Sequence, residues 1–473
     1  MQKRNLLIII LFLFTGTIGW SAERIRQNFD FDWQFRLGEQ GIYKPVQLPH
    51  DWSIELDFNE EVGPESGYLP GGIGYYKKDF NVPASYKGKR VSIVFDGIYH
   101  KATIYLNGQE VDYHRYGYTS FETDLTPYLK YGGKNTLSVK VDHSEKSRWY
   151  TGSGIYRHVW MQVTNPIHVK MWGTYITTPR VSAESAIVSC VTTVANTSAL
   201  TGEIEIMQRI VDAQGNLLKI NGKQYAARTE VVMPENGTKD IAQSFTLSNP
   251  QLWNLEKPYL YRLETILKQK GKVIDRYTTR FGVRTIGFDK DKGFFLNGKN
   301  IKMKGACLHQ DAGCLGVAVP NRSYERRLTI LKEFGANAIR CSHNPPSPEF
   351  LNYCDSIGFL VVDEAFDKWK SGYYEQFFDE CWQQDIRDMI VRDRNHPSIV
   401  LWSIGNELAE ATRKDNVGVE RATLLRDFVH KLEPTRPTML ALAPAYQDKF
   451  ASVTDVVGYN YSELSYIEDK KKH

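Results

Sequence analysis

The sequence predicts two β-sandwich domains followed by an incomplete parallel βα barrel. Short runs of alternating apolar and polar residues, separated by turn residues, fill residues 24–165 and again 166–285, which is the pattern of half-buried antiparallel strands. From 286 to 473 strand and helix signals alternate instead, and this indicates parallel βα units. A chain of 473 residues is also far longer than one ordinary domain.

The first 22 residues have the pattern of a signal peptide. Lys3 and Arg4 precede an unbroken apolar run over residues 6–14, and the small pair Ser21-Ala22 follows. Because the run is too short to span a bilayer, we favour an exported protein, periplasmic or secreted, with no membrane association once the peptide is removed. An N-terminal membrane anchor is the alternative.

Charge and cysteine content exclude several classes of protein. Lysine and arginine total 59 and aspartate and glutamate 55, a difference of +4, which gives no electrostatic footprint for a nucleic-acid partner. The six cysteines are dispersed and form no CxxC pair, which argues against a disulfide scaffold or a zinc site. We therefore expect free thiols.

The first domain is expected over residues 23–165. Residues 90–95, 101–106 and 136–141 alternate as strands, and Asn107-Gly108 between two such runs is a strong hairpin signal. The domain is therefore predicted to be an all-β sandwich. Aromatic residues crowd its loops. Their rings could stack on sugars, but core packing is the favoured interpretation.

The second domain is expected over residues 166–285. Alternating runs at 187–194, 203–211 and 261–269, with turn residues between them, fit a seven-stranded immunoglobulin-like sandwich. No group of residues in it suggests chemistry, so the prediction is a spacer.

The third domain is expected over residues 286–473. Six strands are predicted, at 301–309, 338–343, 359–365, 398–407, 438–443 and 453–461. Helices follow the first four, and Ser323 and Ser347 are the expected N-caps of the first two, with Pro348 in the first turn of the second. The last two helices are expected at about 380–393 and 417–432.

Six βα repeats with apolar strands predict a (β/α)8 barrel. An open doubly wound sheet is the alternative, but no glycine-rich phosphate loop follows the first strand. A full barrel takes roughly 250 residues, whereas 286–473 holds 188. We therefore expect about two βα units to be missing and interpret the chain as truncated.

Polar side chains recur at the carboxyl ends of these strands, where barrel enzymes place their working residues. Reading the strand ends in order gives His309, Arg340 with His343, Asp363 with Glu364, Asn406 with Glu407, and residues 459–461. A core strand has no structural need for such residues, so the shared position predicts one active site.

Carboxylates and amides at barrel strand ends suit glycoside hydrolysis, in which one carboxylic acid protonates the leaving oxygen and a second carboxylate attacks or activates water. Glu407 is the predicted proton-transferring carboxylate, and Asn406 is a suitable donor to a sugar 2-hydroxyl.

Two other site chemistries are possible from these residue types. Cys341 and His343 share a strand face and could form a nucleophile–base pair, although side-chain alternation leaves them parallel rather than opposed. A metal site from His309, Asp311, His343 and Glu364 is a further alternative, but no tight ligand spacing such as HExxH supports it.

Two barrel segments resemble the signatures of glycoside hydrolase family 2, the β-galactosidase, β-glucuronidase and β-mannosidase group. Residues 393–407 (DRNHPSIVLWSIGNE) resemble the acid/base signature, and 337–362 resemble the other, except that Asn344 stands where many members have tyrosine. The N-terminal region is similar as well, at 48–52, 95–97, 105–108 and 152–157.

The resemblance implies a jelly-roll sandwich, an immunoglobulin-like sandwich and a TIM barrel. It implies Glu407 as acid/base with Asn406 as its partner, and His309, Arg340 and His343 as residues of the sugar pocket. Tyr461 matches the tyrosine that hydrogen-bonds the nucleophile, with Tyr459 as the alternative register.

Three departures from the family pattern bear on function. Arg148 stands where some members have an acidic sugar-binding or metal-linked residue, and Lys368 and Trp369 stand where magnesium-binding members have ligands. We therefore expect no metal and no other cofactor. The family nucleophile is a glutamate on the seventh strand, which this chain lacks. Glu364 or Asp363 is the alternative nucleophile.

The sequence therefore predicts a retaining, exo-acting glycosidase that removes terminal β-galactosides from an oligosaccharide or other glycoside, with this chain alone inactive. β-Glucuronidase and β-mannosidase are the alternatives within the family. An inactive carbohydrate-binding remnant is the alternative of another class, and a homo-oligomer is left open.

Overall fold

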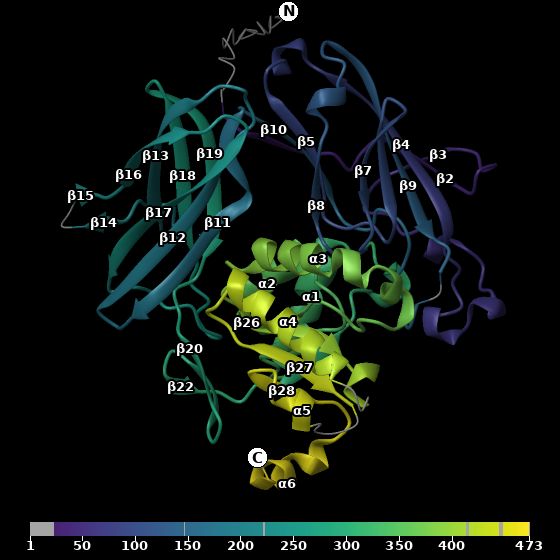
Figure 1. The fold of residues 1–473 in the computed structure, drawn as a ribbon, viewed down its shortest axis with the longest axis vertical. Helices are drawn as coiled ribbons and strands as arrows, with labels where there is room; N and C mark the ends of the chain where they lie inside the picture. Colours follow the sequence, from purple (N-terminus) through teal and green to yellow (C-terminus); the bar gives the residue numbers. More distant parts are fainter. Residues whose placement is uncertain (1–22, 146, 221–222, 413–415, 444–447, 473) are drawn as a thin grey trace, which may run out of the picture.

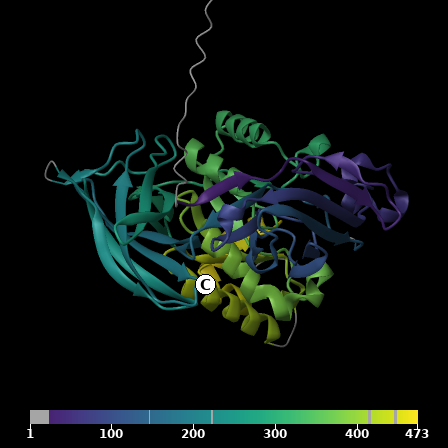
Figure 2. The same ribbon diagram turned by 90° about the horizontal axis from the view of Figure 1, so that it is seen from above.

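The computed structural model describes residues 23–145, 147–220, 223–412, 416–443 and 448–472. The predicted signal peptide lies outside the described residues. Two β-sandwiches stand side by side above a parallel βα domain, which contacts both (Figure 1). The view from above shows the helices of the third domain beneath and between the sandwiches (Figure 2). In the described part of the chain no helix is both long and apolar enough to cross a bilayer.

The N-terminal sandwich consists of two antiparallel sheets. One sheet has the order β1 (Ile25–Asn28), β10 (Val159–Thr164), β5 (Arg90–Phe95) and β8 (Phe121–Asp124). The other has the order β3 (Lys44–Val46), β2 (Trp33–Leu37), β4 (Gly72–Val82), β9 (Gly133–His143), β6 (Ala102–Leu106) and β7 (Gln109–His114). The predicted hairpin joins β6 and β7, with φ of +53° at Asn107 and +85° at Gly108. These positive angles explain why the turn uses Asn-Gly.

The second sandwich is also antiparallel. A three-stranded sheet of β11 (Ile167–Val181), β12 (Ser185–Asn196) and β17 (Gly237–Ser248) packs on a four-stranded sheet of β16 (Ala227–Met233), β13 (Gly202–Val211), β18 (Tyr261–Gln269) and β19 (Lys272–Phe281). A small hairpin, β14 (Lys219–Ile220) and β15 (Lys223–Gln224), extends from one edge. Two sheets of three and four strands are the arrangement predicted for an immunoglobulin-like domain.

The third domain contains a half-barrel of six parallel strands. After a small sheet of β20 (Ile286–Asp289), β21 (Gly293–Leu296) and β22 (Lys299–Asn300), the strands follow one another in chain order. They are β23 (Gly305–Leu308), β24 (Ala338–Cys341), β25 (Leu360–Glu364), β26 (Ile399–Asn406), β27 (Thr438–Leu442) and β28 (Val456–Tyr459). The strand order never reverses, as it would in a doubly wound sheet, so the barrel prediction is confirmed.

The helices α1 (Asn321–Glu333), α2 (Pro348–Ile357), α3 (Phe378–Asp393) and α4 (Val417–Leu432) cover the outer face of this sheet. The short α5 (Asp448–Ala451) packs against α4, and α6 (Tyr466–Lys472) extends beyond the sheet at the C-terminal end (Figure 1). Single-turn 3-10 helices occupy connections at η1 (Ser53–Glu55), η2 (Glu60–Val62), η3 (Pro64–Ser66), η4 (Ala84–Tyr86), η5 (Thr126–Tyr128), η6 (Gly313–Leu315), η7 (Gly372–Gln376), η8 (Ala409–Thr412) and η9 (Glu463–Ser465).

Three sequence predictions about element ends were wrong. The sixth strand was expected at 453–461, but β28 covers only Val456–Tyr459. Ser323 is not an N-cap, because α1 begins two residues earlier at Asn321, after an extended Pro320. The first barrel strand does not start at Ile301, because the backbone N–H of Ile301 donates instead to Phe294 of the preceding small sheet. The parallel strand β23 therefore has only four residues.

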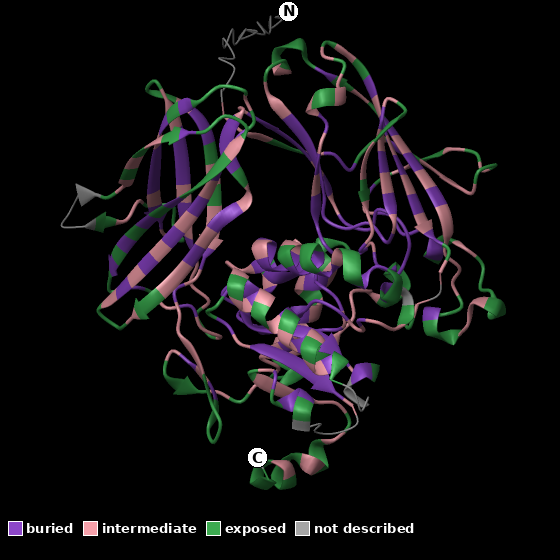
Figure 3. Ribbon diagram, in the orientation of Figure 1, coloured by how far each residue is buried: buried purple, intermediate pink, exposed green. Residues whose placement is uncertain are grey.

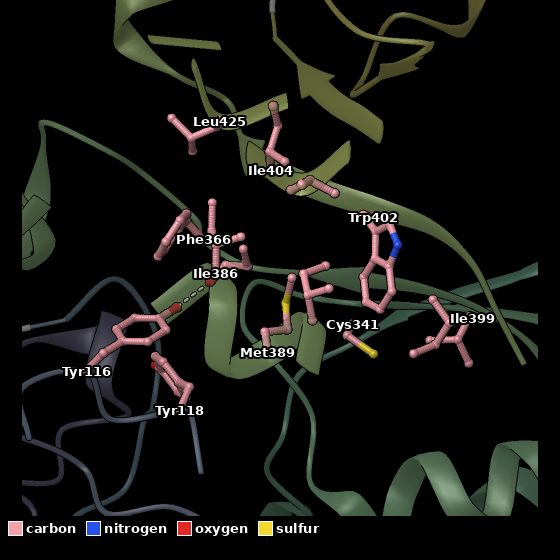
Figure 4. Packing of buried hydrophobic residues seen from close by; sticks show 14 of the residues in the cluster. Tyr116, Tyr118, Cys341, Phe366, Ile386, Met389, Ile399, Trp402, Ile404 and Leu425 are labelled. Carbon is pink, nitrogen blue, oxygen red and sulfur yellow. Dashed lines mark hydrogen bonds between the residues drawn. The ribbon is translucent and has the colours of Figure 1, made fainter. Parts of the chain in front are cut away.

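The largest hydrophobic core lies between the barrel strands and their helices. Trp402 and Ile404 of β26 and Ile386 of α3 have no exposed surface, and burying such a side chain stabilises the fold by about 1.5–3 kcal/mol. Tyr116 and Tyr118 of the N-terminal sandwich enter the same core (Figure 4). The burial pattern shows this continuity, since buried residues run through the contact between the two domains (Figure 3).

Polar contacts also join the domains. Arg157 of the N-terminal sandwich donates to the carbonyl of Pro345 in the barrel at 2.8 Å. In the second sandwich, the Tyr175 hydroxyl donates to Glu433 Oε1 at 2.8 Å, while Trp402 Nε1 donates to Oε2 at 3.0 Å. Burial opposes the ionisation of Glu433, yet Arg436 and these hydrogen bonds hold its pKa at about 2. An ionised carboxylate thus bridges the second sandwich and the barrel.

Replacing the N-cap of α2 tests where the first two barrel helices begin. The Ser347 hydroxyl accepts from the N–H of Phe350 at 3.2 Å, so Ser347→Ala should reduce the free energy of unfolding by about 0.5–2 kcal/mol. Ser323→Ala is the matched control, because Ser323 lies inside α1 and its loss should change stability by less than about 0.5 kcal/mol. Urea unfolding measures both. Equal effects of the two substitutions would contradict the assignment.

Candidate active site

The centre of the site is a buried ion pair between β24 and β25. Arg340 Nε and Nη2 donate to Glu364 Oε2 at 2.9 and 2.7 Å, and the Glu364 side chain has no exposed surface. Two hydrogen bonds to one carboxylate offset part of the cost of burying both charges. Burial acts to lower the pKa of Arg340, but the Glu364 carboxylate outweighs it and raises that pKa. The pair is therefore a fixed ionic unit.

Two further side chains complete the surroundings of Glu364. His343 Nδ1 lies 2.6 Å from Glu364 Oε1, and Ser403 on β26 donates to Oε2 at 2.5 Å. Both carboxylate oxygens are thus engaged by protein groups. Glu364 orients its neighbours and presents no free oxygen to a substrate.

Asn406 reaches the same cluster because β26 contains a bulge. Between Ser403 and Asn406 the strand advances three residues, while its partner β27 advances two. The extra residue shifts the side-chain alternation and turns Asn406 inward, as bulges beside active sites do. Asn406 Oδ1 accepts from Arg340 Nη2 at 2.9 Å, and its Nδ2 donates to Asp367 Oδ1 at 2.9 Å.

Glu407 follows in a left-handed backbone conformation, with φ of +47°, which is uncommon for a residue other than glycine. Its Oε1 accepts from Asn460 Nδ2 at 2.9 Å. Its Oε2 lies 3.8 Å from Arg148 Nη2 and 4.0 Å from Lys368 Nζ. The side chain is 20% exposed, so the carboxyl group is accessible from the barrel mouth.

Arg148 enters this site from the N-terminal sandwich. Its Nε lies 2.8 Å from Asp367 Oδ2, and Asp367 also accepts the Asn406 side chain. Lys368 Nζ donates to the backbone carbonyl of Asn406 at 2.8 Å, and burial lowers its pKa. Two cations and two carboxylates therefore surround the end of β26.

Three rings form a wall next to the charged cluster. The Trp149 ring centroid lies 5.1 Å from that of His309 and 5.7 Å from that of His343, and the two histidines are 5.5 Å apart. Burial, and then His343, lower the pKa of His309, so this ring is held neutral. Beside the wall lies a pocket of about 650 Å³, open space at its mouth included, which is lined in part by Arg148, Trp149, His343, Asp367 and Lys368.

The structure brings together most of the residues that the sequence singled out. Glu407, Asn406, Arg340 and His343 are linked by the contacts above, and His309 stands in the ring wall. It does not bring Tyr461 to them. Its side chain is 88% exposed, while Asn460, one position earlier, contacts both Asn406 and Glu407. The binding role of Tyr461 stays a prediction.

Sequence reasoning gave no role to three members of the site. Asn460 lies inside the predicted strand end 459–461, but only the tyrosines on either side of it were given a role, and β28 ends at Tyr459. Ser403 is hidden inside an apolar strand and carries no signal. Asp367 lies beyond its strand, and only its contacts in the fold, with Arg148 of another domain and with Asn406, mark it.

The described residues do not form the alternative sites that the sequence left open, namely a nucleophile at Asp363, a Cys341–His343 pair or a metal site. Asp363 lies on the opposite face of β25 from Glu364, and burial, together with Asp393, raises its pKa well above the usual range. Burial raises the pKa of the Cys341 thiol well above its usual value, which suits an inert core residue. Among the residues that the structure describes, no three histidine, cysteine or acidic side chains gather as a metal site.

Comparison with family models covers the chain almost from end to end. Residues 31–166 match the model of the sugar-binding domain of glycosyl hydrolases family 2, and residues 289–470 match that of its TIM barrel domain. Residues 167–284, which form the second sandwich, match the model described as glycosyl hydrolases family 2. The chain belongs to glycoside hydrolase family 2.

Relatives within family 2 carry more than one activity in their names. The β-galactosidase BoGH2A of Bacteroides ovatus is 41% identical to this chain, over 93% of this chain and 57% of that protein. A putative β-glucuronidase of Formosa agariphila is 36% identical, over 92% and 42% respectively. A family 2 crystal structure from Bacteroides cellulosilyticus has a TM-score of 0.90 at 39% identity and covers 95% of this chain and 60% of that chain. The chain thus spans less than two thirds of the length of these family 2 proteins.

The buried ion pair makes a sharp prediction for stability. Glu364→Gln leaves Arg340 without its charged partner in a buried position, and breaking such a pair costs about 3–5 kcal/mol. The matched control is Glu205→Gln, since Glu205 is partly exposed and pairs with Arg228 and Lys268, and each such surface pair contributes less than about 1 kcal/mol. Chemical unfolding measures both. A Glu364 variant as stable as the control would show that the cluster is not held by this pair.

Proposed function

We propose that the protein is a retaining glycosidase that releases terminal β-galactosyl residues, with Glu407 as the general acid and base. The observation that carries this proposal is the state of the Glu407 carboxyl group. Asn460 fixes Oε1 by a hydrogen bond, whereas Oε2 makes no hydrogen bond within the described residues and faces the mouth between two cations. One oxygen is anchored and the other is free to exchange a proton, as acid/base catalysis requires.

In the first step, Glu407 gives its proton to the leaving glycosidic oxygen, and a second carboxylate attacks the anomeric carbon. Glu407 then carries a negative charge, which Arg148 and Lys368 offset from 3.8 and 4.0 Å. In the second step, the Glu407 carboxylate takes a proton from water as the water attacks the anomeric carbon of the glycosyl intermediate and displaces the second carboxylate. Asn406 lies beside it with its Nδ2 group on the inner side of the strand, where a sugar 2-hydroxyl could accept from it.

We propose further that the second carboxylate comes from a residue outside this sequence. Glu364 has both oxygens engaged by Arg340, His343 and Ser403. Asp367 pairs with Arg148 and accepts from Asn406. Neither is free to attack an anomeric carbon, and a retaining enzyme needs its two carboxylates about 5–5.5 Å apart across the bond. The 473-residue chain by itself should then bind a sugar without turning it over.

Charge balance favours a neutral sugar over a uronic acid. The cluster contains Arg148, Arg340 and Lys368 against Glu364, Asp367 and Glu407, and each cation lies within 4.0 Å of one of these carboxylates. Even with Glu407 protonated, each of these three cations keeps a carboxylate within 3.4 Å, Arg148 and Lys368 at Asp367 and Arg340 at Glu364. A sugar carboxylate would have to compete with Asp367 or Glu364 for its cation, at a cost in buried charge. The name of the Bacteroides ovatus relative supports the same choice.

Substrate choice is tested by comparing 4-nitrophenyl β-galactoside, β-glucuronide and β-mannoside with the protein from the complete reading frame. The galactoside should have the highest kcat/KM, by about tenfold or more, which corresponds to about 1.4 kcal/mol of transition-state binding. Faster turnover of the glucuronide would replace the galactosidase proposal by the second activity named among the relatives.

The role of Glu407 is tested by Glu407→Gln, which keeps the size of the side chain and removes its proton. We expect kcat/KM to fall by about 10²–10⁴, the usual contribution of general acid–base catalysis. Glu420→Gln, at an exposed glutamate on α4, is the control and should leave kcat/KM unchanged. Turnover by the 473-residue chain alone would sink the proposal of an external second carboxylate, and turnover unaffected by Glu407→Gln would sink the acid/base assignment.

Export stays a proposal that rests on residues 1–22 alone. The N-terminal residue of the mature protein, isolated from the periplasm or the medium, decides it. An uncleaved Met1 would count against a signal peptide.

A further inference from the structure

Residues 147–154 form a short segment of the N-terminal sandwich that we call the strap. Two of its side chains lie in the barrel mouth. Arg148 pairs with Asp367 at 2.8 Å, and Trp149 packs against His309 and His343. Both strap residues line the pocket beside Glu407. The position of the strap therefore sets one wall of the site, although it belongs to a different domain from the strands that carry the carboxylates.

The strap is held by a buried carboxylate that the mechanism does not use. Asp51 lies in the connection between β3 and η1 and is 2% exposed. Its Oδ1 accepts from the N–H groups of Ser53 and Ser153 at 3.1 and 2.9 Å. Its Oδ2 accepts from the Tyr150 hydroxyl, and from the N–H of Val317 at 3.0 Å. Four donors converge on one side chain, and they come from three separate segments of the chain.

Those segments include both sides of the domain contact. Ser153 and Tyr150 belong to the strap, whereas Val317 belongs to the barrel connection between β23 and α1. That connection starts next to His309, the ring against which Trp149 packs. Asp51 therefore ties the strap to the same stretch of barrel that the strap must face.

Two glycines let the backbones approach closely enough for this contact. Gly152 has φ of +64°, and a Cβ atom there would lie 2.0 Å from Val317 Cγ2. Gly316 has φ of +62°, and a Cβ atom there would lie 2.4 Å from Asp51 Oδ2. A side chain at either position would push the strap away from the barrel. Close approach is thus built into the backbone and does not depend on Asp51 alone.

We propose that Asp51 is a positioning residue that holds Arg148 and Trp149 in the sugar site by fastening the strap to the barrel. The inference rests on the proposed function for its link to sugar binding, but its geometric part stands on the hydrogen bonds themselves. A carboxylate is needed because all four partners are donors. An amide in its place would turn an N–H group toward two of them, and buried unpaired donors are costly. Burial raises the pKa of Asp51, and the hydrogen bonds from Tyr150, Val317, Ser153 and Ser53 counteract that effect.

The test compares Asp51→Asn with Asp30→Asn, a matched control. Asp30 is also buried and accepts three hydrogen bonds, from Asn28, His158 and the N–H of Val159, all within the sandwich. Both substitutions remove a buried charge from the same domain, so both should lower its stability. Only Asp51→Asn should loosen the strap. Tyr150→Phe, which removes one of the four donors, should have a smaller effect in the same direction.

The first measurement uses the 473-residue chain itself. Hydrogen exchange at the amides of Ser153 and Val317 should speed up by about tenfold or more in Asp51→Asn, since local opening controls such exchange. The same amides should be unchanged in Asp30→Asn. Equal exchange in the two variants, or unchanged exchange in Asp51→Asn, would overturn the proposal that Asp51 fastens the strap.

The second measurement separates positioning from general destabilisation. With 4-nitrophenyl β-galactoside and the protein from the complete reading frame, Asp51→Asn should lower kcat/KM by about tenfold or more. KM should rise because Trp149 is displaced from the pocket wall, and kcat should fall because Arg148 no longer offsets the charge that develops on Glu407. Asp30→Asn should change neither constant by more than about twofold. Parallel losses in both variants would overturn the link to the site. Failure of the unsubstituted protein to hydrolyse any glycoside would refute the proposed function, while the exchange measurement would still decide whether Asp51 holds the strap.

Discussion

The ion pair between Arg340 and Glu364 is the interaction on which the arrangement of the site depends. Glu364 is fully buried at the end of β25, where an isolated carboxylate would be strongly destabilising. Its compensation comes from β24, from His343 and from β26 through Ser403. The polar ends of three neighbouring strands are thereby fixed relative to one another. Arg340 also donates to Asn406 and so fixes the side chain of the residue that precedes the proposed acid/base.

The two sandwiches differ in how they serve the barrel. The N-terminal sandwich supplies part of the site wall through Arg148 and Trp149 and shares the barrel core through Tyr116. The second sandwich contacts the barrel at Glu433, away from the mouth, and its role as a spacer stays a prediction. This chain matches family 2 models in all three domains, and the contacts between the first sandwich and the barrel give a physical reason why these two domains act as one unit.

Local chemistry determined what could be predicted from the sequence. The Asn107-Gly108 hairpin, the Ser347 cap and the strand carrying Glu407 follow from short-range preferences that the structure satisfies. The bulge in β26 and the choice of Asn460 over Tyr461 depend on register between distant strands, which no local pattern encodes. The place of Arg148 was likewise unpredictable, because its partner Asp367 lies 219 positions away.

The bulge in β26 and the left-handed turn at Glu407 have a consequence for how this segment can vary. A regular strand shows every second residue to a bound molecule, yet here Asn406 and Glu407 both face the mouth. Exchanging one apolar residue of the strand for another leaves the orientation of these two side chains unchanged. Deleting or inserting a single residue between Ser403 and Glu407 would reverse this orientation and turn Glu407 toward the helix layer. The segment is thus tolerant in composition and rigid in length, so homologous proteins aligned here should differ by substitution and not by gaps.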